Sequence, residues 1–134
     1  MLVQKFGGTS LADLAGFKAS AAVVRKFAAD EKLVAVFSAV AGVTDLLVSA
    51  IDAASAGERF ADSMDQALER EQSVLAELQG DGVQAPLAVA FLDQQRQMLA
   101  SKLEGIRLLG NCPDEVRAEI LASGEGYSSR LMAD

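Results

Sequence analysis

The sequence predicts an α/β fold in which one parallel β-α-β unit leads into a long helical region. Two short apolar runs, residues 2–6 and 33–37, have the length and the unbroken hydrophobicity of buried strands. Between them, apolar residues recur every three or four positions, which is the spacing of an amphipathic helix. From Thr44 onward this helical spacing continues, and clusters of β-branched residues stop.

The first strand is expected over Leu2–Phe6, because the apolar run ends at a pair of glycines where the backbone can turn sharply. Ser10, followed three residues later by Asp13, has the pattern of a helix start. The helix is expected to run to about Ala29. Its buried face is predicted to consist of Leu14, Phe17, Ala21, Val24 and Phe27.

The second strand is expected over Leu33–Phe37, after a polar turn at residues 30–32. Its apolar residues do not alternate with polar ones, so we expect it to be covered on both faces. A helix that connects two parallel strands predicts a right-handed crossover.

The rest of the chain is expected to form helices separated by glycine and proline. They are predicted over Thr44–Ala56 with Thr44 and Asp45 as its cap, from Phe60 to the glycines at 80 and 82, from Pro86 to Gly110, over Asp114–Ala122 and over Tyr127–Asp134. In the third of them we expect Leu87 on the buried side and Gln95 on the polar side.

Two parallel strands cannot bury their faces or satisfy their edges without further strands. We therefore expect residues 1–134 to be the N-terminal part of a larger domain. The alternative is that a second copy of the chain completes the sheet.

Composition excludes several classes of function. A net charge of -7 without a basic patch argues against nucleic acid, and no apolar run reaches the roughly 18 residues of a membrane span. The start of the chain reads directly into a strand, without a signal peptide, which predicts a cytoplasmic protein. With no histidine and only Cys112, imidazole and thiolate metal sites are absent, and we expect no metal site. We expect Cys112 to be buried filler.

The segment from Lys5 to Ser10 follows the first strand and leads into a helix, which is where open α/β sheets bind ligands. Gly7 and Gly8 let the backbone approach an oxyanion, and Lys5 adds a positive charge. Thr9 and Ser10 complete a candidate phosphate cradle. The segment matches neither a Walker loop nor a dinucleotide fingerprint, and a plain structural turn remains the alternative.

Two further segments are candidate site loops. Residues 38–45 place Ser38 and Thr44 after the second strand, so that both strand ends face one crevice, although hydroxyls at such positions also serve simply as caps. Glu125 lies between two glycines at an expected helix start. It either favours the helix dipole or accepts hydrogen bonds from a substrate ammonium group.

These three segments resemble the motifs of the aspartokinases, in the family's order and at about its spacing. Lys5 to Ser10 resembles the opening signature, residues 38–47 are similar to the second motif, and Gly124-Glu125 with Ser128 is similar to the third. Residues 105–114 resemble the corresponding stretch of the bifunctional aspartokinase/homoserine dehydrogenases.

The resemblance implies the three-layer α/β/α amino-acid-kinase fold, which is carbamate-kinase-like, and an enzyme that phosphorylates the side-chain carboxylate of L-aspartate. This reaction is the first step of lysine, threonine and methionine biosynthesis. ATP with Mg²⁺ would be the co-substrate, and a homo-oligomer is expected. Lys5 would contact the transferring phosphates, with Gly7, Gly8, Thr9 and Ser10 around them. Thr44 and Glu125 would hold aspartate, and Ser38 would line the same crevice.

The third motif departs from the family pattern, because Gly126 follows Glu125 where most members have a bulky or basic residue. The nucleotide motifs of the family's second half are also missing, so we expect the 134 residues alone to be inactive. Two other functions stay open. One is a sibling kinase acting on glutamate, acetylglutamate or a nucleotide, and the other is a non-catalytic α/β binding module.

Overall fold

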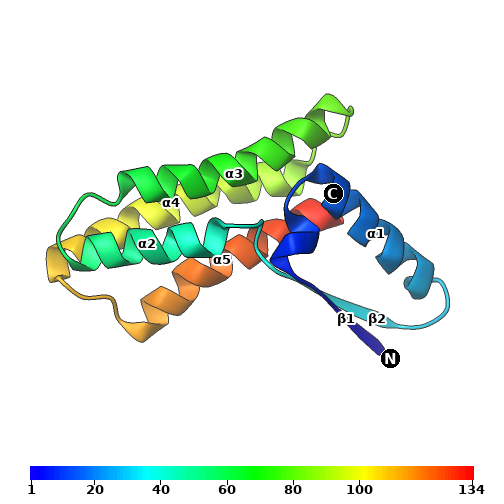
Figure 1. Ribbon diagram of the computed structural model, residues 1–134, viewed down its shortest axis with the longest axis horizontal. Helices are drawn as coiled ribbons and strands as arrows, with labels where there is room; N and C mark the ends of the chain where they lie inside the picture. Colours follow the sequence, from blue (N-terminus) through cyan, green and yellow to red (C-terminus); the bar gives the residue numbers. More distant parts are fainter.

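The computed structural model describes all residues from 1 to 134 and contains two strands, one short 3-10 helix and five α-helices (Figure 1). In chain order these are β1 (Leu2–Phe6), η1 (Gly8–Leu11), α1 (Leu14–Ala28), β2 (Leu33–Phe37), α2 (Val43–Ser55), α3 (Ala61–Gly80), α4 (Pro86–Leu109) and α5 (Asp114–Ala133). Both strands begin and end at the predicted residues. None of the helices combines the length and the apolar character that crossing a membrane requires.

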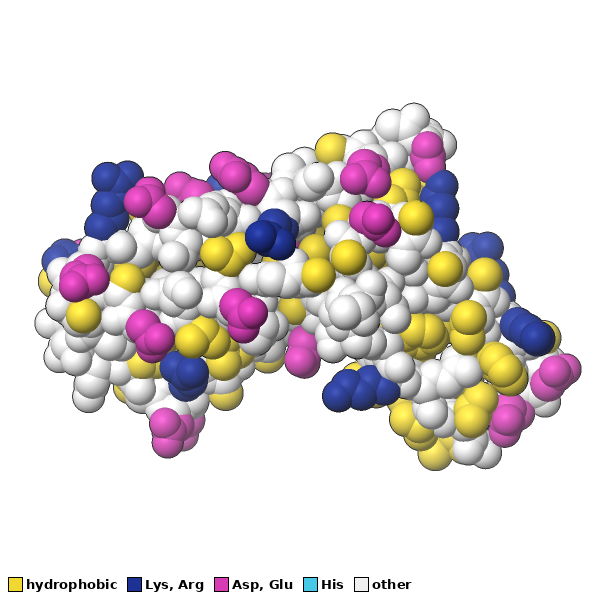
Figure 2. All heavy atoms as spheres, in the orientation of Figure 1, with side chains coloured by type: hydrophobic (Ala, Val, Ile, Leu, Met, Phe, Trp, Pro, Cys, Tyr) yellow, Lys and Arg dark blue, Asp and Glu magenta, His cyan; other side chains and the backbone are white.

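The two strands pair in parallel from Leu2 opposite Leu33 to Phe6 opposite Phe37. The Phe6 and Phe37 rings stack on the covered face, with centroids 5.2 Å apart. On the other face, the exposed fractions of three valines are large: 62% for Val3, 45% for Val34 and 44% for Val36. The expectation of strands covered on both faces is therefore wrong for this chain, because its helices pack on one face only. Hydrophobic side chains accordingly gather on the surface at this end of the molecule (Figure 2).

Helix α1 begins one turn later than the Ser10 pattern predicted. Asp13 is its N-cap, and the Asp13 carboxylate accepts a hydrogen bond from the amide of Gly16 at 2.9 Å. Residues 8–11 form η1 instead of the first helical turn. A Cβ atom at residue 16 would lie 2.3 Å from the carbonyl oxygen of Ser10, so this fold-back requires glycine there.

Helices α2 to α5 lie side by side and enclose the hydrophobic core, while the strands and α1 project from one end of them (Figure 1). The largest fully buried apolar side chains in this bundle are Leu47, Ile51, Leu68, Leu99, Leu103, Ile106, Ile120 and Tyr127. Pro86 opens α4, and Gly110 ends it with a φ of 79°. These are the positions at which the sequence predicted the start and the end of that helix.

The sequence misassigned three residues in and just after α4. Leu87, expected inside, is 50% exposed, while Gln95, expected outside, is 2% exposed. Gln95 is buried because its amide satisfies polar groups of α3 and α5, namely Glu71 and Ser123. Cys112, expected to be buried, is only half-buried and lies in the turn before α5.

Helix α5 is continuous, and the break predicted at residues 123–126 is wrong. Gly124 and Gly126 lie inside the helix. The loop after β2 approaches Gly124 closely, and helix α4 approaches Gly126. A Cβ atom at residue 124 would lie 2.8 Å from the Cβ atom of Ala39, and one at residue 126 would lie 2.9 Å from the ring of Phe91. These glycines therefore permit close packing and do not form a turn.

Candidate active site

A small cavity of about 220 Å³ lies where the loops that follow the two strands meet the middle of α5. Its lining comes from three segments that are distant in the sequence. The residues that line it are Gly8, Ser38, Ala39, Val40, Ala41, Gly42, Thr44, Asp45 and Glu125. The cavity is thus at the carboxyl edge of the sheet, where α/β folds place ligands.

Backbone hydrogen bonds bring the two loops together. The amide of Ser38 continues the strand ladder by donating to the carbonyl of Phe6 at 2.9 Å, and the amide of Ala41 donates to the carbonyl of Leu11 at 3.4 Å. A Cβ atom at Gly8 would lie 3.8 Å from the carbonyl oxygen of Ala39. The first loop therefore runs directly over the second.

Helix α2 starts from this second loop. Gly42 precedes the helix with a φ of 83°, a left-handed conformation that glycine adopts without strain. The predicted capping by Thr44 and Asp45 is wrong, because α2 begins at Val43 and no side chain caps it. Thr44 and Asp45 lie instead in the first turn and line the cavity.

Glu125 reaches the cavity from the opposite side. It is exposed and lies in the middle of α5, next to Gly124, which packs on Ala39. That close contact brings this part of the helix against the loop after β2. The position of the Glu125 carboxylate therefore depends on helix packing and not on the helix start that the sequence predicted between the two glycines.

The chemistry of the cavity is that of a site for a small zwitterion. Two carboxylates, from Asp45 and Glu125, can accept hydrogen bonds from an ammonium group. The hydroxyls of Ser38 and Thr44 can donate to a carboxylate, and the positive end of the α2 dipole favours a negative group nearby.

The predicted phosphate-binding residues lie beside this cavity, and only one of them lines it. Gly8 is part of its wall, whereas Gly7, Thr9 and Ser10 are exposed. Lys5 is exposed too and pairs with Val36 on the uncovered face of the sheet. The structure thus brings Gly8, Ser38, Thr44 and Glu125 together and leaves the other four outside.

Sequence reasoning missed Asp45 as a lining residue and Arg70 as a neighbour of the site. Arg70, on α3, donates from Nη1 to the carbonyl oxygen of Ala41 at 3.1 Å. Arg70 lies 29 positions further along the chain than Ala41, and no local pattern marks it. Asp45 was visible in the second motif, but it was interpreted as a helix cap.

The residues present do not fit a protein-held metal. No group of three or more histidine, cysteine, aspartate or glutamate side chains is placed to hold an ion. The two carboxylates of the cavity would leave most positions around Mg²⁺ to other ligands.

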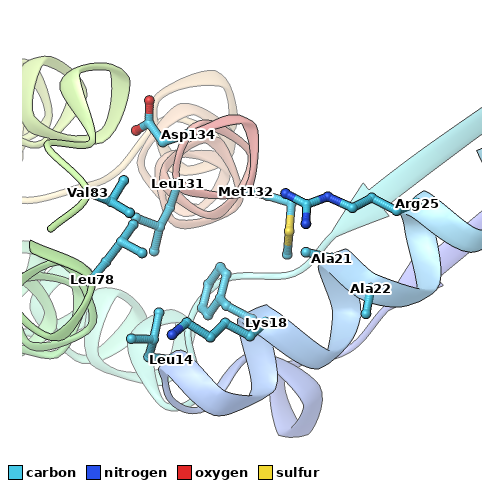
Figure 3. A pocket seen from close by; sticks show the side chains of 11 residues that line it. Leu14, Lys18, Ala21, Ala22, Arg25, Leu78, Val83, Leu131, Met132 and Asp134 are labelled. Atoms are coloured by element: carbon cyan, nitrogen blue, oxygen red, sulfur yellow. The ribbon is translucent and has the colours of Figure 1, made fainter. Parts of the chain in front are cut away.

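A larger, mostly apolar pocket of about 400 Å³ lies between α1 and the end of α5 (Figure 3). Its polar groups are largely engaged elsewhere: Lys18 pairs with Asp81, and the Asp134 carboxylate accepts hydrogen bonds from the amides of Leu87 and Ala88. This pocket offers no convergent acids or hydroxyls, so the candidate site is the cavity at the strand ends.

Comparison with known proteins agrees with the resemblance inferred from the motifs. The amino acid kinase family matches residues 1–133. The chain is 31% identical to the bifunctional aspartokinase/homoserine dehydrogenase of Haemophilus influenzae and 30% identical to a chloroplastic enzyme of the same description from Arabidopsis thaliana. Each match covers 98% of this chain but only 16% and 14% of the relative.

Solved structures show the same fold. Aspartokinase III of E. coli in complex with lysine and aspartate superposes with a TM-score of 0.73 at 27% identity, over 99% of this chain and 28% of that one. The same enzyme in complex with aspartate and ADP gives a TM-score of 0.67 at 26% identity. The chain therefore belongs to the amino acid kinase family, has the amino-acid-kinase α/β fold and resembles the aspartokinases of that family.

Proposed function

We propose that the cavity holds L-aspartate and that the chain is the N-terminal part of the catalytic domain of an aspartate kinase. One observation carries the proposal: Thr44 of α2 and Glu125 of α5, which the aspartokinase resemblance marks as substrate residues, line one small cavity together with Gly8. The E. coli aspartokinase III structures, which superpose on this chain, contain aspartate, and one of them contains ADP.

In this proposal the acidic groups and the hydroxyl groups bind different parts of the substrate. Glu125 and Asp45 accept hydrogen bonds from the α-ammonium group of aspartate. Ser38 and Thr44 donate to a carboxylate. The phosphates of ATP lie against the segment formed by Gly7, Gly8, Thr9 and Ser10. The positive charge of Lys5 attracts these phosphates. Magnesium arrives as a complex with ATP.

The proposed reaction needs no general base. A side-chain carboxylate oxygen of aspartate attacks the γ-phosphorus of ATP, the bond from that phosphorus to the β,γ-bridging oxygen breaks, and ADP leaves. The nucleophile is already ionised at neutral pH, so alignment and charge neutralisation carry the rate. A site without histidine is sufficient for this chemistry.

The chain spans 28% of the solved aspartokinase III chain and 16% of the first curated relative. We propose that turnover requires a longer chain, while the half-site for aspartate is complete enough to bind. The 134 residues then bind L-aspartate without forming aspartyl phosphate. In the longer enzyme the product feeds lysine, threonine and methionine synthesis.

Thermal melts test this proposal, because a ligand that binds only the folded state raises the unfolding midpoint. The chain is melted with L-aspartate, L-glutamate and Mg-ATP added separately. We expect L-aspartate to raise the midpoint more than L-glutamate does. Glu125→Gln and Thr44→Val should abolish the shift, and Glu115→Gln, an exposed acid elsewhere on α5, should keep it.

Two results contradict the proposal. One is an unchanged midpoint at saturating L-aspartate. The other is an equal shift for the wild-type chain and the Glu125→Gln variant, since aspartate would then bind outside the cavity. A larger shift with L-glutamate would assign the site to a sibling kinase.

A further inference from the structure

Arg70 holds the loop that forms one wall of the cavity. Its Nη1 atom donates to the carbonyl oxygen of Ala41 at 3.1 Å. The guanidinium also packs closely against the next residue, because a Cβ atom at Gly42 would be 2.5 Å from Nη1 and 2.9 Å from Cζ. The φ of 83° favours glycine at position 42, and the Arg70 side chain fills the space beside it.

The residue after Arg70 holds the other wall. The hydroxyl of Tyr127 donates to the backbone carbonyl oxygen of Glu71 at 2.5 Å. Tyr127 is fully buried and lies two residues beyond Glu125 on α5. Burial raises the pKa of Tyr127, so the phenol stays protonated and keeps donating at ordinary pH.

Both walls of the cavity are therefore fastened to two consecutive residues of α3, although α3 itself does not line the cavity. We propose that the Arg70 side chain and the Glu71 carbonyl, together called the α3 bracket, set the separation of Thr44 and Glu125 and so position the ligand-binding groups. Arg70 is a positioning residue in this arrangement. The ligand named here, L-aspartate, rests on the proposed function, whereas the bracket itself does not.

Arg70 adds a side-chain hydrogen bond to a loop whose residues Ala39 and Val40 are already buried in the core. Apart from the helix start, the tie of this loop to η1 is the 3.4 Å bond from the Ala41 amide to the Leu11 carbonyl, which is long for such a bond. Arg70 is exposed, so its removal should loosen the loop locally without unfolding the bundle. A general structural role would instead speed amide exchange throughout α2 to α5.

The test compares Arg70→Met with Arg70→Lys in the 134-residue chain. Methionine has a similar reach but no donor, while lysine keeps the charge and N–H donors without the planar fork of the guanidinium. Arg96→Met is the matched control, because Arg96 is an exposed arginine on the adjacent helix α4. Three quantities are measured for each variant: the unfolding midpoint, the amide hydrogen exchange of Val43 and Leu46, and the dissociation constant of L-aspartate.

We expect Arg70→Met to speed exchange at Val43 and Leu46 about tenfold, the factor that corresponds to one hydrogen bond of ordinary strength, and to lower the midpoint by only about 5 °C. Arg70→Lys should be intermediate, and Arg96→Met should match the wild-type chain. L-Aspartate should bind about tenfold more weakly to Arg70→Met. In a second arm, Tyr127→Phe should shift the amide resonance of Glu125 and weaken aspartate binding.

The bracket is rejected if exchange at Val43 and Leu46 is the same in Arg70→Met as in the wild-type chain, or if Arg96→Met has an equal effect. This outcome is distinct from failure of the proposed function. If the wild-type chain does not bind L-aspartate, the proposed function fails, and the exchange rates still decide about the bracket. If the wild-type chain binds it and Arg70→Met binds it equally well with unchanged exchange, only the bracket fails.

Discussion

The side-chain amide of Gln95 donates a hydrogen bond of 3.1 Å to the carboxyl group of Glu71, and both side chains are buried in the helical bundle. The same amide nitrogen also donates to the hydroxyl of Ser123 at 3.0 Å. This small network joins α3, α4 and α5, and it shares Glu71 with the α3 bracket. Burial raises the pKa of Glu71 to about 8, although the hydrogen bond from Gln95 opposes that rise.

A raised pKa at Glu71 makes stability depend on pH. Between pH 4.5, the ordinary pKa, and about 8, the folded chain holds a proton that the unfolded chain has released. The free energy of unfolding therefore falls as pH rises through this window, by up to about 5 kcal/mol, and levels off above it. No histidine titrates in the same range.

Glu71→Gln should remove this pH dependence, because glutamine copies the shape of the neutral acid. Urea unfolding at a series of pH values between 5 and 8.5 measures it. We expect a declining free energy for the wild-type chain, a flat profile for Glu71→Gln, and a declining profile for the exposed neighbour Glu69→Gln. A wild-type profile that stays flat or rises would show that Glu71 is ionised when folded.

Gly124→Ala should destabilise the chain by about 1–2 kcal/mol, even though alanine favours helices. The new methyl group would lie 2.8 Å from the Cβ atom of Ala39 and 3.3 Å from Val43, both close to the cavity. Denaturant unfolding measures the change. Gly105→Ala is the control, because a Cβ atom there meets nothing within 4 Å, and it should stabilise the chain by about 0.5–1 kcal/mol. Equal effects at the two positions would refute close packing at Gly124.

Asp134 acts as an N-cap for a helix that begins 48 residues earlier. Its carboxylate oxygens accept from the amides of Leu87 at 3.2 Å and Ala88 at 2.9 Å, the first turn of α4. Asp134→Ala should therefore lower the free energy of unfolding by about 1 kcal/mol. Asp93→Ala, an exposed acid in α4, should leave it almost unchanged. Equal losses for the two variants would argue that no specific cap is formed.

Lys5 should matter for turnover and not for folding. It is exposed and pairs with Val36 at the end of β1, so Lys5→Met should leave the unfolding midpoint unchanged. In an active, longer form of the enzyme the same change should lower kcat by at least about 100-fold, as loss of a charge on a transferring phosphate does. Steady-state formation of aspartyl phosphate measures this. A fully active variant would remove Lys5 from the mechanism, and Lys32→Met is the control.

The strands could be read from the sequence because their signals are local. Leu2–Phe6 and Leu33–Phe37 are apolar runs bounded by glycines or polar turns, and the structure confirms both ranges. The break in α5 could not be judged in this way. Whether a glycine ends a helix or admits a neighbour depends on residues far away, here Ala39 and Phe91.

The site was predictable in part for the same reason. Ser38 and Thr44 follow a strand, so the topology of parallel strands places them with Gly8. Glu125 was noted for its flanking glycines and assigned to the substrate by resemblance, but its position depends on how α5 packs against Ala39. Arg70 gives no sequence signal, because an exposed arginine on a helix usually faces solvent.

Aspartate binding at the cavity is tested most directly by titrating the isotopically labelled 134-residue chain with L-aspartate and following its backbone amide resonances. We expect saturable shifts concentrated at Gly8, Ser38, Thr44 and Glu125, and their loss in the Glu125→Gln variant. Binding at the cavity is refuted if no resonance moves, or if the shifts are concentrated at the apolar pocket between α1 and the end of α5.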